Sequence, residues 1–249
     1  MSTMANTQKK TGTASNVFIA TVALSASGMV VDGFFRAHTW HLWEFLGLLL
    51  ASTLTARLKV KLPGLNSNMS VSLPFLFIAM ARLSLPEMLF TAAFSVFTQS
   101  VPKSPHKFNP VHALFNVATG VLATGLSWEG FQRASAVHAN TTVCLLFGCV
   151  TYLLASTLPV AGIISLTDNH KAFQTWSEIM HLSFPYYVAS TGLASIALSV
   201  QGNTTWSLLV GMSLVAFVMY NSYRRYFGVA NTGTSKPEAN QSKAAAAGA

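Results

Sequence analysis

The longest runs of this chain without Asp, Glu, Lys or Arg constrain its fold more than any other feature. One extends from Ile179 to Tyr223 and another from Ala134 to Thr167. Each is longer than the ~20 residues with which an α-helix crosses a bilayer. Only 9% of the residues are charged and 51% are hydrophobic, whereas soluble domains carry about 25% charged residues. This composition excludes a typical soluble enzyme, a disordered protein and a disulfide-rich secreted module, and it predicts a polytopic membrane protein.

Polar and proline-containing breaks divide the apolar sequence into helices. We expect an all-α, polytopic transmembrane bundle of six to eight helices, with eight as the best count. Ser84 and Glu87 form the pattern of a capping box, and Pro159 with Gly162 predicts a kink or an end in the sixth helix. The expected helices cover residues 17–35, 41–56, 69–81, 85–101, 109–128, 141 to about 159, 175–200 and 205–227. Residues 17–227 would form the transmembrane domain, and residues 1–16 and 228–249 would be disordered cytoplasmic ends.

The basic residues are distributed unevenly between the expected loops. If eight spans alternate from a cytoplasmic N-terminus, every Lys and Arg except Arg36, Arg82 and Arg133 falls on one side. Cytoplasmic loops of membrane proteins carry such an excess, so we expect both termini in the cytoplasm and a multi-pass protein of the bacterial inner membrane. The net charge of +8 is then a signal of topology, and no nucleic-acid partner is expected.

Four polar residues at the non-cytoplasmic ends of the first two helices form a candidate metal site. Imidazole and carboxylate groups bind zinc, copper or iron, and three of these residues repeat at a spacing of three along one helical face. The alternative is a belt of polar groups that solvates the two helix ends. The four residues are Asp32, His38, His41 and Glu44.

Two histidines near cytoplasmic helix ends could stand at similar depth. Bis-imidazole ligation of haem by His112 and His181 needs this geometry, although such histidines also serve packing. Glu178 precedes His181 by three residues, which fits either a proton relay or a favourable charge at a helix start.

A strip of polar side chains in the third to fifth helices is costly to expose to lipid. Such residues either bond to neighbouring helices or line a small ligand cavity. The candidate ligand-binding residues are Asn68, Ser70, Gln99, Asn116 and Trp128. Arg82 and Glu87 flank one outer turn and could pair there.

The chain contains no phosphate-binding lysine loop, nucleophile elbow, Cys-x-x-Cys or dinucleotide fingerprint. Its two cysteines, Cys144 and Cys149, are expected to be reduced packing residues. These observations favour a protein that is not an enzyme, and they identify no cofactor.

The middle of the chain resembles a known bacterial family. The resemblance lies in residues 45–130, in the segments 58–64 (LKVKLPG), 69–72 (MSVS), 83–87 (LSLPE) and 109–118 (NPVHALFNVA), together with Gln99. They resemble the multi-helix membrane sensor region that precedes GGDEF or HD-GYP domains. The fold of that region is similar to the substrate-binding membrane subunits of energy-coupling-factor vitamin transporters and to the rod-shape protein MreD.

The resemblance implies an intramembrane sensor or ligand-binding bundle and supplies no catalytic residues. Because about 22 residues follow the last expected helix, with no effector domain, we expect the protein to act as a subunit of a larger membrane assembly. Its expected partners are the lipid bilayer, other membrane subunits and a small-molecule ligand. The alternatives are a vitamin-like transporter's substrate-binding subunit and an accessory or redox subunit of a bioenergetic complex.

Overall fold

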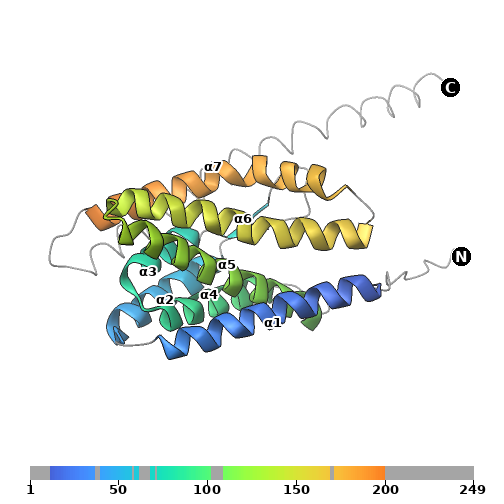
Figure 1. Ribbon diagram of the computed structural model, residues 1–249, viewed down its shortest axis with the longest axis horizontal. Coiled ribbons are helices and arrows are strands. Elements are labelled where there is room, and N and C mark those ends of the chain that lie inside the picture. The colour runs from blue at the N-terminus through green and yellow to red at the C-terminus, as the bar shows by residue number, and fades with distance from the viewer. Residues whose placement is uncertain are drawn as a thin grey trace, which may run out of the picture.

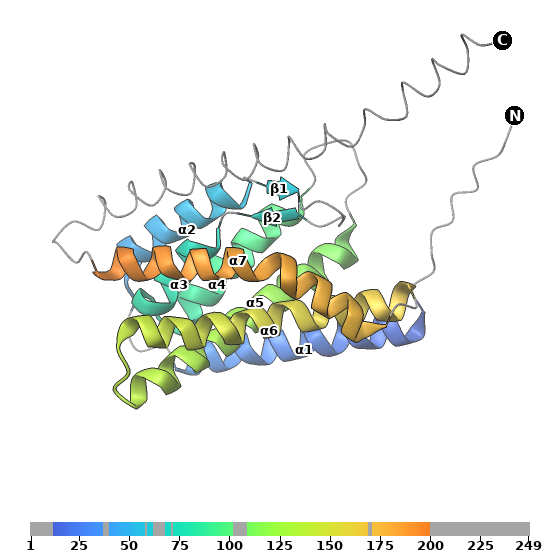
Figure 2. The same cartoon turned by 90° about the horizontal axis from the view of Figure 1, so that it is seen from above.

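The computed structural model describes residues 12–36, 40–57, 59–61, 68–70, 72–101, 109–168 and 171–199. These ranges form a helical bundle with one short hairpin (Figures 1 and 2), which confirms the all-α class. The elements are α1 (Thr13–Phe35), α2 (Leu42–Ala56), β1 (Lys59–Lys61), β2 (Asn68–Ser70), α3 (Leu73–Arg82), α4 (Leu85–Ser100), α5 (Pro110–Ala136), α6 (Thr141–Asp168) and α7 (Ala172–Ser199). The eighth expected helix, 205–227, and the expected disordered tail, 228–249, lie outside the described residues.

Three helices in the described ranges are long and apolar enough to cross a membrane. They are α1, α5 and α6. At 1.5 Å per residue, each is about 35–40 Å long, which exceeds the ~30 Å hydrocarbon core of a bilayer. The shorter helices α2 and α3 are also apolar. The expectation of transmembrane helices is therefore supported by length and composition.

Local sequence signals set several helix boundaries. The capping box of Ser84 and Glu87 opens α4 as predicted. The Asn109 side chain accepts hydrogen bonds from two backbone N–H groups at the start of α5, and Pro110 occupies the first helical position, where its missing N–H costs nothing. The helix α6 begins at Thr141, as predicted, but it continues through Pro159 to Asp168 instead of ending there.

Other expected boundaries are wrong. Asn68–Ser70 is a strand, not the start of the third helix, and it pairs antiparallel with Lys59–Lys61. The helix α5 continues past Trp128 to Ala136, and α1 begins at Thr13, before residue 17. Charges mark where apolar sequence stops, but Glu129 and Arg133 are compatible with a helix that continues beyond the apolar layer.

The helix α3 lies at the centre of the bundle. Every residue from Leu73 to Met80 is buried, and the core around this helix includes residues of α2, α5, α6 and α7. A second core joins α1, α4 and α5. The helices α1 and α5 run in the same direction, because Phe18 contacts Phe115 near their starts and Arg36 contacts Glu129 near their ends.

Candidate ligand cavity and the charged end of the bundle

Charged side chains lie close together where α1 ends, α2 begins and α3 is followed by α4. We call this region the charged end, and its residues are Asp32, Arg36, Glu44, Arg82, Glu87 and Glu129. Arg36 bridges two helices there. Its Nε lies 3.0 Å from Asp32 Oδ2 on α1, and its Nη1 lies 2.6 Å from Glu129 Oε1 on α5. The guanidinium fork suits two carboxylates at once, so it ties the end of α1 to α5.

The carboxylate of Glu87 is the most deeply buried charged group among the described residues, with a relative exposure of 0%. Its Oε1 accepts a hydrogen bond of 2.7 Å from the backbone N–H of His41. Its Oε2 accepts from the backbone N–H and the hydroxyl of Ser84, at 2.9 and 2.6 Å. Buried carboxylates require such partners, and Glu87 thereby joins the start of α2 to the start of α4.

The arginine expected beside Glu87 has a different neighbour. Arg82 Nη1 lies 4.0 Å from Glu44 Oε1, and both side chains are partly exposed. The expected Arg82–Glu87 pair is therefore not formed. Glu87 accepts hydrogen bonds from backbone N–H groups, and Arg82 lies near Glu44 on α2.

The residues of the predicted metal site take different roles in the structure. Asp32 pairs with Arg36, Glu44 lies near Arg82, and His41 contributes its backbone N–H to Glu87. His38 lies outside the described residues. Within the ranges that are described, no three His, Cys, Asp or Glu side chains are grouped so that they could hold a metal ion.

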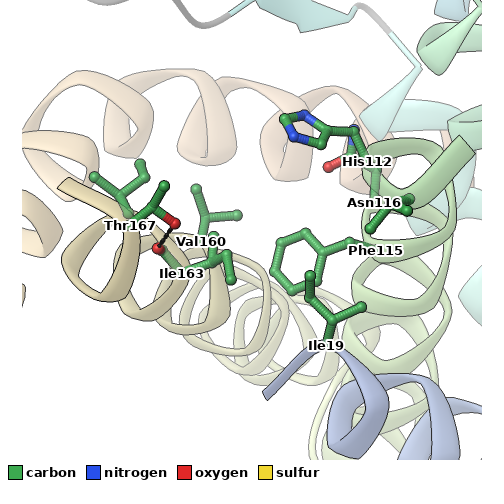
Figure 3. A pocket seen from close by; sticks show the side chains of 9 residues that line it. Ile19, His112, Phe115, Asn116, Val160, Ile163 and Thr167 are labelled. Carbon is green, nitrogen blue, oxygen red and sulfur yellow. Dashed lines mark hydrogen bonds between the residues drawn. The ribbon is translucent and has the colours of Figure 1, made fainter. Parts of the chain in front are cut away.

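A cavity of about 290 Å³ lies between α1, α5 and α6 (Figure 3). It is found where α1 and α5 begin and α6 ends, at the opposite end of these helices from Arg36 and Glu129. Its volume is close to the lower limit of small-molecule sites, ~300 Å³. This region is called the cavity, and its lining consists of Ile19, Val111, His112, Phe115, Asn116, Val160, Ile163, Ile164 and Thr167.

The polar groups of the cavity are concentrated on α5. His112 and Asn116 are one helical turn apart and both are exposed, and neither side chain has a hydrogen-bond partner in the described part of the chain. Thr167, on α6, already donates its hydroxyl to the carbonyl of Ile163 at 2.7 Å. Figure 3 shows His112 and Asn116 on one side of the cavity and Val160 and Ile163 on the other. The cavity therefore has one polar edge and otherwise apolar walls.

Of the predicted ligand-binding residues whose side chains the structure describes, Gln99, Asn116 and Trp128, only Asn116 lines this cavity. Trp128 lies twelve positions further along α5, about 18 Å away, and packs against both cores; its buried Nε1 has no hydrogen-bond partner in the described ranges. Asn68 and Ser70 belong to β2, and Gln99 is a partly buried residue of α4.

The two histidines considered for haem are not members of one described site. His112 lines the cavity, whereas His181 is an exposed residue of α7 and does not line it. Glu178 is likewise exposed on α7.

Sequence reasoning missed most of the lining. Ile19, Val160, Ile163 and Ile164 are ordinary apolar residues of apolar helices, and nothing in their local sequence distinguishes a cavity wall from a lipid-facing surface. Only the packing of three separate helices identifies them.

No family model matches the chain, and no curated protein or solved structure matches it. The resemblance to the bacterial membrane sensor region therefore stays a prediction from the quoted segments.

Proposed function

We propose that this chain is a non-enzymatic integral membrane protein that binds a small lipid-soluble ligand in the cavity and acts as a sensor or ligand-binding subunit of a larger membrane assembly. One observation carries the proposal. Two polar side chains without partners among the described residues, His112 and Asn116, face an apolar cavity between helices that are long enough to span a membrane. Ligand sites combine apolar walls with a few such polar groups.

The charges at the two ends of the bundle support an orientation in the membrane. Arg36, Arg82 and Arg133 lie where α1, α3 and α5 end. Arg57 and Lys171 lie at the opposite end, where α2 ends and α7 begins. In the eight-span topology expected from the sequence, all twelve remaining Lys and Arg of the chain, Arg57 and Lys171 among them, fall on the side of the second end. This excess supports a cytoplasmic location for that end, in a multi-pass protein of the bacterial inner membrane. The cavity would then open in the cytoplasmic half of the bilayer.

The outer surface of the bundle supports contact with lipid or with other subunits. Large apolar side chains are exposed on several helices, among them Leu24, Leu50, Phe94 and Phe147. An apolar surface of this extent is stable in a bilayer or against a membrane partner, whereas in water it would promote association.

The test uses a substitution that fills the cavity. We expect wild-type protein, extracted with its surrounding lipid and analysed by native mass spectrometry, to retain a small molecule. Ile163→Trp adds a large ring inside the cavity and should abolish retention. Leu24→Trp places the same ring on an exposed position of α1 and should leave retention unchanged.

The proposal fails if wild-type protein retains no small molecule and binds none in a screen of membrane lipids and metabolites. Equal retention by wild-type protein and Ile163→Trp would show that the ligand binds elsewhere.

A further inference from the structure

The cavity also indicates the chemical class of its ligand, an inference that rests on the proposed function. Among the residues that the structure describes, none that lines it is a Lys, Arg, Asp or Glu. A charged group bound among apolar walls without a counter-ion pays a large desolvation cost. The lining therefore favours an uncharged molecule.

The two helix ends nearest the cavity, those of α5 and α6, offset each other's field. The first turns of α5 and the last turns of α6 both line it, so helix termini of opposite polarity lie close together. At the start of α5, two backbone N–H groups that would attract an anion already donate to the Asn109 side chain, at 3.1 and 3.4 Å.

His112 and Asn116 supply the polar recognition. They stand four residues apart on α5, which places them on the same helical face. Neutral imidazole offers one donor and one acceptor, and the Asn amide can donate through its NH₂ group. Both side chains can therefore donate to a single ligand oxygen, or to two neighbouring oxygens, along this edge.

Phe115 lies between these two residues in the sequence and presents an aromatic ring to the same cavity. It is 6% exposed, and its ring packs at 6.4 Å from that of Phe18 on α1. A flat ring in the ligand would extend this aromatic contact in the offset or edge-to-face arrangements that aromatic groups prefer. The opposite wall, with Val160 and Ile163, offers only apolar contacts.

We propose that the ligand is an uncharged, lipid-soluble ring compound with a ring carbonyl and an apolar tail, the chemistry of a membrane quinone. The carbonyl accepts hydrogen bonds from His112 and Asn116, the ring packs against Phe115, and the apolar remainder follows the α6 wall toward the lipid. The inference concerns binding alone and assigns no electron transfer to the protein.

Three probes with the same decyl chain test this class. They are a decyl-substituted benzoquinone, decylbenzene, which lacks the carbonyl groups, and decanoate, which is charged. Binding to the full-length chain in nanodiscs is measured against empty nanodiscs, to correct for partition into lipid. We expect the quinone to bind about tenfold more tightly than decylbenzene, which corresponds to ~1.4 kcal/mol, and decanoate to bind most weakly.

Substitutions locate the effect. His112→Leu and Asn116→Leu should each remove most of the quinone's advantage and leave decylbenzene binding unchanged. His181→Leu changes another exposed histidine, outside the cavity, and should preserve the advantage. Ile163→Trp should abolish binding of every probe.

The outcomes separate the ligand class from the proposed function. Decylbenzene or decanoate binding as tightly as the quinone overturns the ligand class and leaves a ligand-binding protein. If the protein retains a native ligand but does not bind the quinone, the ligand class is likewise wrong and the protein still binds a ligand. If no probe binds and the wild-type protein retains no small molecule, the proposed function fails with it.

Discussion

The charged end and the cavity use polar side chains in opposite ways. At the charged end, Arg36 joins Asp32 to Glu129, and Glu87 accepts hydrogen bonds from the starts of two helices. In the cavity, His112 and Asn116 have no such partners among the described residues and face empty, largely apolar space. Both regions contain residues of α1 and α5. At one end of this pair of helices the polar side chains have partners within the protein, and at the other end they have none among the described residues.

This difference separates groups that stabilise the fold from groups that are available to a ligand. A buried polar group that is fully hydrogen-bonded contributes to stability, and removing one partner leaves the others unsatisfied. A polar group without a partner contributes little to stability and can donate to a ligand at no cost to the fold. The two ends should therefore respond differently to substitution.

The largest loss of stability is expected for Glu87→Ala. It removes a buried carboxylate and leaves the N–H groups of His41 and Ser84 without their acceptor in partly buried positions, which costs about 3 kcal/mol. Thermal unfolding in detergent, followed by circular dichroism, measures the loss. Glu178→Ala removes an exposed carboxylate of α7 and is the matched control. Equal stability of the two variants would show that Glu87 does not hold the charged end together.

A smaller loss is expected for Gly120→Ala, between the two regions on α5. A Cβ at this position would lie 2.8 Å from Val96 Cγ2 on α4, and a β-branched side chain has little freedom to move away. We expect about 2 kcal/mol of destabilisation from overpacking, measured by the same unfolding experiment.

Gly28→Ala is the control for this substitution, because a Cβ at Gly28 meets nothing within 4 Å. It should leave α1 unchanged or more stable by about 0.5–1 kcal/mol, since alanine is the better helix former. A loss of stability in Gly28→Ala would contradict the packing described for α1.

Arg36→Ala tests the other part of the charged end, and its expected effect is smaller. The Arg36 side chain is 50% exposed, and ion pairs at exposed positions contribute at most about 1 kcal/mol. Raising the salt concentration should weaken the wild type toward the variant. A loss as large as that of Glu87→Ala would mean that the ion pairs, and not the buried carboxylate, dominate this end.

The smallest change in stability is expected in the cavity. His112→Leu and Asn116→Leu should each alter the free energy of unfolding by less than about 0.5 kcal/mol, because both side chains are exposed and have no partner in the described ranges. Their effect should be confined to ligand binding. A loss above 1 kcal/mol in either variant would remove the distinction between the two regions.

Local signals in the sequence predicted much of the fold. The capping box of Ser84 and Glu87, the Asn109–Pro110 start of α5 and the start of α6 at Thr141 all involve groups within a few residues of each other. The hairpin was missed because strands of three residues carry too little periodicity to be distinguished from a helix start. Of the two outcomes predicted at Pro159, an end of the helix is wrong, because α6 continues to Asp168.

The site was less predictable because its contacts are not local. Arg36 and Glu129 are 93 residues apart, and nothing near either residue indicates the other. His112 and Asn116 were both recognised as candidates, but for two different sites. They share one cavity only because α1 runs parallel to α5 and α6 returns beside them.

The short central helix has a consequence for the order in which the protein assembles. The ten residues of α3 span about 15 Å, half the thickness of the hydrocarbon core, and the hairpin before them ends well short of the starts of α1 and α7 (Figure 2). In a bilayer, non-helical backbone beside so short a helix would need cover from protein or from a water-filled cavity. Part of the cover of α3 comes from α7, which is synthesised after it. If the chain inserts into a membrane during synthesis, α3 would be held between α2 and α4 until α7 arrives, and a chain truncated before Ala172 should be degraded rather than accumulate in the membrane.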